Sequence, residues 1–192
     1  MKVTELGLPG VLLLEPRLFR DERGAFVESW SARRFAAAGL GVEFVQDNVS
    51  WSRRGVVRGL HYQHPHGQAK LISVLRGEVW DVVVDVRRGS PTFGQWIGVP
   101  LSAESGHQLF IPEGYAHGFA ALSEEAIFSY KCSRYYDPAS EWTIRWDDPE
   151  LKIDWPVEDP IVSEKDRNGL RLSELGPEAL PELGPVAGLR VE

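Results

Sequence analysis

The 192-residue chain has a single cysteine, Cys132, and a single methionine. One cysteine can form neither an internal disulfide nor a thiolate metal cluster, and this scarcity is typical of a reducing compartment. The chain also has no run of about 18 apolar residues, and its first residues lack the basic, apolar and small-residue order of a signal peptide. We therefore expect a cytoplasmic protein with no membrane-spanning helix.

Positive charge is scarce relative to negative charge. The chain has 21 Lys and Arg residues against 28 Asp and Glu residues, which gives a formal net charge of -7. Proteins that bind nucleic acids or membrane surfaces broadly need a basic face, so this balance argues against both classes. If the protein binds an anion, a local cluster of Arg and Lys must hold it.

The length and the hydrophobic content predict one domain. With 192 residues, of which 43% are hydrophobic, the chain can bury one substantial core and has little room for a second. We expect residues 1–172 to form this domain. The segment 173–192, SELGPEALPELGPVAGLRVE, interrupts short apolar groups with Gly and Pro, which predicts a short helix or a loose surface extension of the same domain.

Short runs rich in β-branched and aromatic residues indicate a mostly β protein. They lie at 71–75, 79–86, 108–111 and 126–131 and are separated by Gly and Pro turns. One helix is expected at 31–38, with Ser31 as its N-cap and Gly39 at its end. Such spacing predicts a sandwich or a barrel.

Several of these strands have polar faces. Because alternate residues of a strand share a face, Gln46, Asn48 and Ser50 point the same way, as do His61 and Gln63. In 79–86, the carboxylates of Asp81 and Asp85 share the face of Val79 and Val83. The interior of a barrel is apolar unless something polar binds there, so these faces indicate a ligand cavity. The alternative is that each polar face lies in solvent.

Two motifs resemble those of cupin-type barrels, in which G-x5-H-x-H-x3,4-E and P-x-G-x2-H supply three His and one Glu to one metal. Pro112, Gly114 and His117 match the second motif. In the first, His61 is present, but Gln63 and Gln68 stand where the partner His and the Glu belong. Neutral amides are poor ligands for zinc, iron or manganese. We expect a cupin-type, all-β jelly roll with a few short peripheral helices and no metal, which leaves the His61 imidazole available as a base.

A metal site built from the loop HPHGQ at 64–68 is the competing interpretation. His64 or His66 could join His61 and His117 as a ligand of a metal-dependent cupin oxygenase. The composition of the loop favours solvent exposure for both of its histidines.

A wider set of residues resembles one family closely. The chain is similar to dTDP-4-dehydrorhamnose 3,5-epimerases in six blocks that follow the order of the family and extend over about the first 170 residues. The blocks are DERGAFVESW (21–30), FVQDNVSWSRRGVVRGLHYQ (44–63), QAKLISVLRGEVWDVVVDVRRGSPTFGQW (68–96), IPEGYAHGF (111–119), YKCSRYYDP (130–138) and SEKD (163–166). The residues after Gly169 match no family pattern.

The resemblance implies a reaction and the residues that perform it. The substrate would be a dTDP-linked 6-deoxy-4-ketohexose, in which the hydrogens on C3 and C5 are acidified by the C4 ketone. Epimerisation through an enolate needs a base, an acid on the opposite face and a cation near the C4 oxygen. The matches give these roles to His61, Tyr130 and Lys70, with no cofactor. The alternatives are a core histidine, a tyrosine packed with Phe128 and a lysine in solvent.

A histidine base is improved by a carboxylate on its other ring nitrogen, which fixes the tautomer. The resemblance assigns this role to Asp166 in SEKD. Asp81 is an alternative on strand alternation, and it could instead orient His117.

The resemblance also implies how the nucleotide binds and how the chain assembles. Arg58, His117 and Lys165 would contact the diphosphate, and Tyr136 would stack on the thymine. The binding set is completed by Arg23, Phe26, Glu28, Gln46, Asp47, Asn48, Lys70 and Glu141. Arg23 and Glu28 would reach the neighbouring subunit's site in a homodimer with exchanged N-terminal strands. Without the resemblance, the favoured interpretation for these two is a surface ion pair in a hairpin turn.

Two further alternatives remain at this point. Within the same fold, the chain could invert only C3 or only C5 of a related dTDP-4-keto-6-deoxy sugar, because the same three catalytic side chains serve either reaction. The second alternative is a non-catalytic module that binds a sugar nucleotide. Binding alone needs neither a base nor a proton donor, so the presence of both argues against it.

Overall fold

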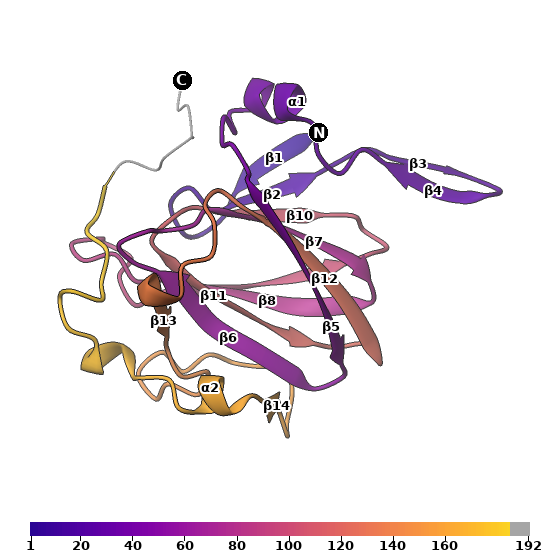
Figure 1. Cartoon of the computed structure of the whole chain (residues 1–192). Coiled ribbons are helices and arrows are strands. Elements are labelled where there is room, and N and C mark those ends of the chain that lie inside the picture. The colour runs from indigo at the N-terminus through magenta and orange to yellow at the C-terminus, as the bar shows by residue number, and fades with distance from the viewer. Residues whose placement is uncertain (185–192) are drawn as a thin grey trace.

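The computed structural model describes residues 1–184 and shows two packed β-sheets with a projecting hairpin (Figure 1). The first sheet has the order β1-β2-β10-β7-β12-β5, and the second has the order β13-β6-β11-β8-β9, with β14 paired to β6. The strands of the first sheet are β1 (Lys2–Glu5), β2 (Leu12–Glu15), β5 (Gln46–Arg53), β7 (Lys70–Arg76), β10 (Gln108–Ile111) and β12 (Glu125–Cys132). Those of the second are β6 (Val56–Gln63), β8 (Glu78–Asp85), β9 (Trp96–Ser102), β11 (Tyr115–Ala121), β13 (Glu141–Thr143) and β14 (Ile161–Val162).

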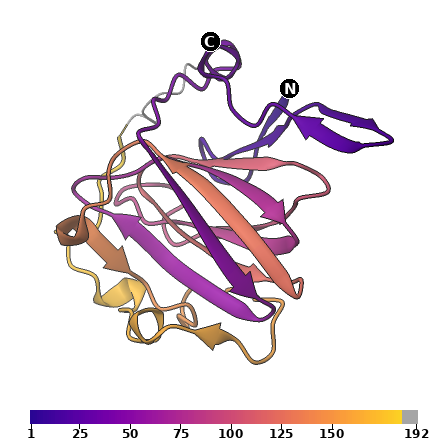
Figure 2. The ribbon, with the colours of Figure 1, turned by 45° about the vertical axis from the view of Figure 1, so that its right-hand side comes forward.

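Helices are few and short. They are α1 (Ala32–Ala37), α2 (Glu164–Arg167) and the 3-10 turns η1 (Pro138–Ser140) and η2 (Leu172–Glu174). The hairpin of β3 (Leu18–Asp21) and β4 (Gly24–Val27) extends away from both sheets, as the turned view shows clearly (Figure 2). The architecture is the predicted all-β jelly roll with short peripheral helices. None of the helices in residues 1–184 is both long and apolar enough to cross a membrane.

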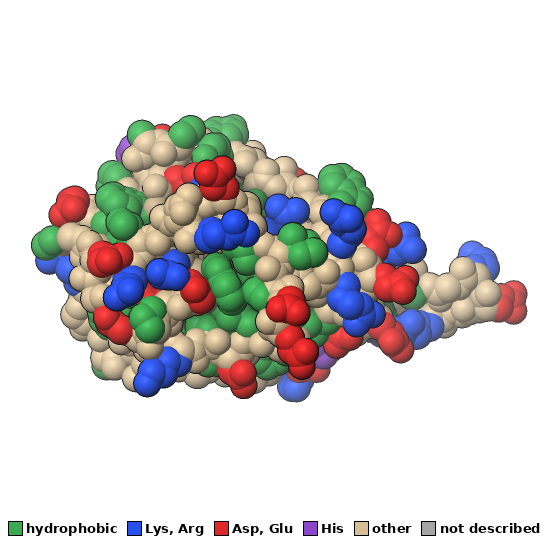
Figure 3. Space-filling view, turned by 90° about the horizontal axis from the view of Figure 1, so that it is seen from below, with side chains coloured by type: hydrophobic (Ala, Val, Ile, Leu, Met, Phe, Trp, Pro, Cys, Tyr) green, Lys and Arg blue, Asp and Glu red, His purple; other side chains and the backbone are tan. Residues whose placement is uncertain are grey.

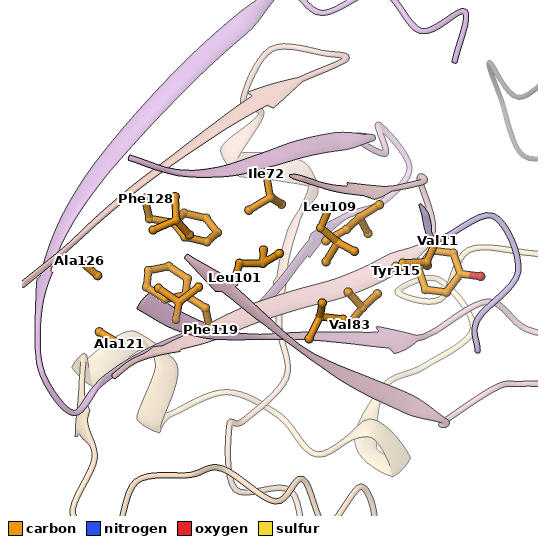
Figure 4. Close-up of a cluster of buried hydrophobic side chains, with 14 of the residues drawn as sticks. Val11, Ile72, Val83, Leu101, Leu109, Tyr115, Phe119, Ala121, Ala126 and Phe128 are labelled. Atoms are coloured by element: carbon orange, nitrogen blue, oxygen red, sulfur yellow. The ribbon is translucent and has the colours of Figure 1, made fainter. Parts of the chain in front are cut away.

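The main core lies between the two sheets (Figure 4). Phe119 of β11 and Phe128 of β12 stack across it with ring centroids 4.1 Å apart. Ile72, Leu101 and Leu109 extend the cluster, and each is almost completely buried. Burying side chains of this size is worth roughly 1.5 to 3 kcal/mol each, so this layer is a large contribution to folding.

A second cluster explains why β8 is a nearly continuous apolar run. Val79 and Val83 point into the main core, whereas Val82 and Val84 point outward and are covered by the later part of the chain. A strand buried on both faces loses the polar alternation of a half-exposed strand. The covering residues of this cluster are Ile144, Leu151, Leu172, Leu175, Ala179 and Leu180.

That covering segment corrects one sequence-based expectation. Leu175, Ala179 and Leu180 are buried, and the Tyr62 hydroxyl donates a hydrogen bond to the Ala179 carbonyl at 3.1 Å. Residues 175–180 are therefore packed against the second sheet and are not a loose surface extension, whereas Glu182 and Leu183 are exposed. The rest of the predicted extension, 185–192, lies outside the described residues, and the domain boundary at 172 stays a prediction.

The predicted strands and the predicted helix are present in the structure. The four predicted strands correspond to β7, β8, β10 and β12, with ends that differ by no more than one residue. The helix predicted at 31–38 is α1, which follows Ser31 in an extended conformation and ends before Gly39, whose φ is 91°. The Ser31 side chain makes no capping hydrogen bond, so only its backbone acts as the N-cap.

Candidate active site

Two adjoining pockets are lined by residues of both sheets. The Tyr136 pocket has a volume of about 210 Å³, and the His117 pocket has a volume of about 360 Å³. They share His61, Lys70, Tyr130 and Glu141, which makes them parts of one hollow. The Tyr136 pocket also includes Gln46, Asn48, Tyr62, Gln63, Gln68 and Tyr136. The His117 pocket also includes Ser50, Arg58, His117, Gly118, Phe119, Phe128, Ser163, Lys165 and Asp166.

His61 of β6 is held by the buried carboxylate of Asp166. The His61 Nε2 atom lies 2.5 Å from Asp166 Oδ1, and the side chains are 30% and 5% exposed. Burial alone would raise the pKa of Asp166, but its hydrogen bonds with His61, Gly59 and Ser163 lower that pKa overall. Because an ionised carboxylate can only accept, Nε2 carries the proton, and Nδ1 has no hydrogen-bond partner among the described residues. This is the tautomer that a base requires.

The backbone around Gly59 sets this geometry. The Gly59 N–H donates to Asp166 Oδ2 at 3.2 Å, and Gly59 has a φ of 114°. A Cβ here would lie 2.6 Å from the Cα of Gly118, so β6 and β11 approach too closely for any other residue. The register between these strands shifts at the same place. On the other side, the Ser163 hydroxyl accepts a hydrogen bond from the Asp166 N–H at 3.1 Å and caps α2.

Tyr130 and Lys70 come from the opposite sheet. Tyr130 lies on β12 and Lys70 begins β7, whereas His61 lies on β6 in the second sheet, so the hollow has a base on one wall and a phenol on the other. Burial raises the pKa of Tyr130, which keeps the phenol protonated as a proton donor requires. The Lys70 Nζ lies 5.8 Å from the centre of the Tyr130 ring.

The Lys70 side chain is half-buried, and its ammonium group lies near two carboxylates. Burial lowers the pKa of Lys70, and the nearby carboxylates of Asp81 and Glu141 oppose this effect. Within residues 1–184, no carboxylate forms an ion pair with the Lys70 ammonium group. An ammonium group that faces the hollow without a direct counterion is suited to an oxygen that gains negative charge.

Asp81 belongs to a second histidine. Both of its oxygens lie 3.0 Å from His117 Nε2, and the two side chains are 0% and 8% exposed. Burial raises the pKa of Asp81 and lowers that of His117, which favours their less charged forms. The structure thus pairs His61 with Asp166 and His117 with Asp81, and His117 and His61 are opposite each other in the β11–β6 register.

A polar cluster stands at the side of the Tyr136 pocket. The Tyr136 hydroxyl donates to Glu141 at 2.9 Å, and the Lys165 ammonium donates to the other Glu141 oxygen at 2.5 Å. Gln46 accepts a hydrogen bond from the Tyr136 N–H at 2.9 Å. The Tyr136 ring itself is exposed, so a flat ring can stack on it. Asn48 and Arg58 complete the predicted residues that line the hollow.

Four predicted site residues do not line this hollow. Arg23 forms an ion pair with Asp21 in the β3–β4 turn, and the exposed Phe26 belongs to the same hairpin. Glu28 lies near Arg34 at 3.3 Å. The Asp47 side chain points to the outer face of β5 and pairs with Lys131 at 2.9 Å.

Residues that the sequence-based site did not include also line the hollow. They are Tyr62, Phe119, Phe128, Gly118 and Ser163, together with Gln63, Gln68 and Ser50, whose side chains were considered only for a metal or a polar face. Strand alternation links Phe128 to Tyr130 and Phe119 to His117, so this signal was present in the sequence.

The loop histidines stand apart from this site. The His66 side chain is 61% exposed and contacts Asp137 at 2.8 Å, and neither His66 nor His64 lines the hollow. In residues 1–184, no group of three or more His, Cys, Asp or Glu side chains is placed to hold a metal ion.

On the face seen in Figure 3, basic and acidic side chains are interspersed.

Comparison with known proteins shows the family to which the chain is similar. The family model described as dTDP-4-dehydrorhamnose 3,5-epimerase matches residues 5–174. The chain belongs to this family. The dTDP-4-dehydrorhamnose 3,5-epimerase of Pseudomonas aeruginosa is 58% identical over 171 residues, which cover 88% of this chain and 94% of the relative.

Other epimerases of the family have the same fold but not always the same named reaction. A dTDP-6-deoxy-D-glucose-3,5-epimerase from Legionella pneumophila, solved in complex with dTDP-4-keto-L-rhamnose, superposes with a TM-score of 0.92 at 48% identity, covering 95% of this chain and 98% of that one. A dTDP-4-dehydrorhamnose 3-epimerase from Streptomyces niveus is 45% identical over 176 residues, covering 91% of this chain and 85% of the relative. Family membership therefore includes both double and single inversion.

Proposed function

We propose that the protein converts dTDP-4-dehydro-6-deoxy-D-glucose to dTDP-4-dehydro-L-rhamnose by inverting C3 and C5, a step of dTDP-L-rhamnose synthesis. The observation that carries the proposal is the placement of His61, backed by Asp166, on one sheet and of Tyr130 and Lys70 on the other. This arrangement provides a base and an acid on opposite sides of one hollow, as inversion at a carbon requires.

Each inversion follows from these groups. His61 Nδ1 removes the proton next to the C4 ketone, and the resulting imidazolium is stabilised by the Asp166 carboxylate. The electron pair moves to the C4 oxygen, where the Lys70 ammonium stabilises the enolate. Tyr130 then protonates the same carbon from the other side. His61 releases its proton and Tyr130 regains one by exchange with water, so the new hydrogen comes from solvent.

The nucleotide is held by residues of both pockets, on either side of the shared catalytic residues. Tyr136 stacks on the thymine, while Arg58, His117 and Lys165 bind the diphosphate, with Gln46, Asn48 and Glu141 beside them. We also propose a homodimer in which exchanged N-terminal strands bring Arg23, Phe26 and Glu28 to the neighbouring site. Its support is the hairpin, which projects with an exposed Phe26 and leaves these residues outside the chain's own hollow. A role for Asp47 and the cytoplasmic location remain predictions.

Product analysis by NMR in deuterated water tests the proposed reaction. Double inversion gives dTDP-4-dehydro-L-rhamnose with deuterium at both C3 and C5. Deuterium at one carbon only, with inversion there alone, would assign the single-carbon reaction named for the Streptomyces niveus relative. In His61→Ala, we expect no deuterium at either carbon, and wild-type turnover in that variant would contradict the role of the base. Stoichiometric metal in the purified protein, with activity lost to a chelator, would support the oxygenase-type alternative.

A further inference from the structure

Three buried polar side-chain atoms in residues 1–184 have no hydrogen-bond partner. They are Ser50 Oγ, Trp80 Nε1 and Gln108 Oε1. Native proteins satisfy nearly all such groups, so each exception requires an explanation. Trp80 packs on the second cluster, and the Gln108 amide nitrogen already binds Ser29 and Ser73. Of the three, Ser50 is the one that lines the His117 pocket.

Ser50 occupies a central place on the inner face of β5. This face carries Asn48, Ser50 and Ser52 in alternation, and Asn48 lies opposite Tyr130 while Ser50 lies opposite Phe128. Ser52 has its own partner, because its Oγ accepts from Arg58 Nε at 3.1 Å. Ser50 therefore lies between Asn48, which is opposite Tyr130, and Ser52, which binds Arg58.

We propose that the Ser50 hydroxyl hydrogen-bonds an oxygen of the substrate's hexose and positions the sugar between His61 and Tyr130. The proposal rests on the dTDP-sugar substrate of the proposed function. A hydroxyl can both donate and accept, which suits a sugar hydroxyl. The aromatic wall of Phe119 and Phe128 beside it supplies apolar contact for a deoxyhexose and no competing acceptor. The diphosphate is better matched by the Arg58 guanidinium, to which the neighbouring serine is already committed.

Binding measurements can test this contact without any turnover. We expect Ser50→Ala to weaken binding of dTDP-glucose by roughly three- to tenfold, the effect of losing one neutral hydrogen bond. Binding of dTDP alone should stay within about twofold of wild type, because dTDP has no hexose. Ser52→Ala is the matched control on the same face. It should weaken dTDP and dTDP-glucose by the same factor, because it acts on Arg58.

The outcomes separate this proposal from the proposed function. If Ser50→Ala weakens dTDP and dTDP-glucose equally, Ser50 contacts the nucleotide or the phosphates, and the proposal is overturned. If both affinities are unchanged in a variant with a wild-type melting temperature, the hydroxyl contacts no ligand, which also overturns it. If the hexose-specific loss occurs but the wild-type protein does not turn over the 4-keto sugar, the Ser50 contact stands and the epimerase function fails. In an active enzyme, Ser50→Ala should also change the ratio of deuterium at C3 to that at C5, which a purely structural effect would leave constant.

Discussion

Replacing Asp166 with Asn tests whether His61 depends on a neighbouring charge. The carboxylate lies 2.5 Å from His61 Nε2 and is 5% exposed, so little water screens the pair from that side. An amide keeps the shape, but it has one acceptor oxygen for two donors, His61 Nε2 and the Gly59 N–H, and it has no negative charge to stabilise the imidazolium. A charged hydrogen bond exceeds a neutral one by about 1 to 1.5 kcal/mol. Two unit charges about 4 Å apart attract by about 4 kcal/mol at an effective dielectric constant near 20, which sets the upper limit.

These limits predict that kcat of Asp166→Asn falls by about 10- to 1,000-fold. The assay is conversion of the 4-keto sugar followed by NMR, with dTDP affinity measured by calorimetry to show that the hollow is intact. Asp137→Asn is the matched control, because Asp137 also contacts a histidine, His66, at 2.8 Å but outside the hollow. A kcat within twofold of wild type for Asp166→Asn, or an equal loss in Asp137→Asn, would refute the reasoning.

Three further predictions concern the cation, the thymine and the buried ion pair. Lys70→Met keeps an apolar stem but removes the cation, so kcat should fall by roughly 100-fold or more. Calorimetry should show a nearly unchanged affinity for dTDP. A kcat equal to that of wild type would exclude a role of Lys70 in stabilising the enolate. Tyr136→Ala should weaken dTDP by about 1 to 3 kcal/mol, whereas Tyr136→Phe, which loses only the hydrogen bond to Glu141, should weaken it much less. Burial alone would raise the pKa of Asp85, but hydrogen bonds from Arg87, Ser90 and Thr92 lower that pKa overall. The Asp85 carboxylate therefore stabilises the fold fully above the ordinary Asp pKa near 4, and this stabilisation is lost as the pH falls through the lower pKa of the folded state. Asp85→Asn should therefore lower the melting temperature at pH 7. Below about pH 4, the melting temperature of the variant should fall less than that of wild type, and an equal fall in both proteins would contradict this.

Much of the fold could be predicted from local patterns. The runs at 71–75 and 79–86 are rich in β-branched residues and bounded by turns, and both are strands. The burial of Leu175, Ala179 and Leu180 was not predicted, because Pro and Gly interrupt these apolar residues and sequence alone does not show that the outer face of β8 needs a cover. Leu175 and Leu180 supply that cover, so their burial depends on tertiary contacts rather than on any local period.

The candidate site was predicted less by pattern than by resemblance. Alternation correctly grouped His61 with Gln63, which both line the Tyr136 pocket. It could not place Arg58 in the same hollow as His61, because residues three apart on a regular strand point to opposite faces. The shift in register beside Gly59 removes this conflict. The pairing of His61 with Asp166 joins residues 105 apart in sequence. The family resemblance favoured Asp166 for this role, whereas strand alternation alone pointed to Asp81.

The two His–Asp pairs show why the same residue types have different capacities in one hollow. Hydrogen bonds lower the pKa of Asp166, so it remains a carboxylate and can stabilise a protonated His61. Burial raises the pKa of Asp81 and lowers that of His117, so this pair resists a separated charge. Groups whose environments move their pKa values apart take different roles in acid–base chemistry. The proposed proton removal therefore suits the more exposed His61. His117, which is 8% exposed, is suited to donate a hydrogen bond to a bound oxygen.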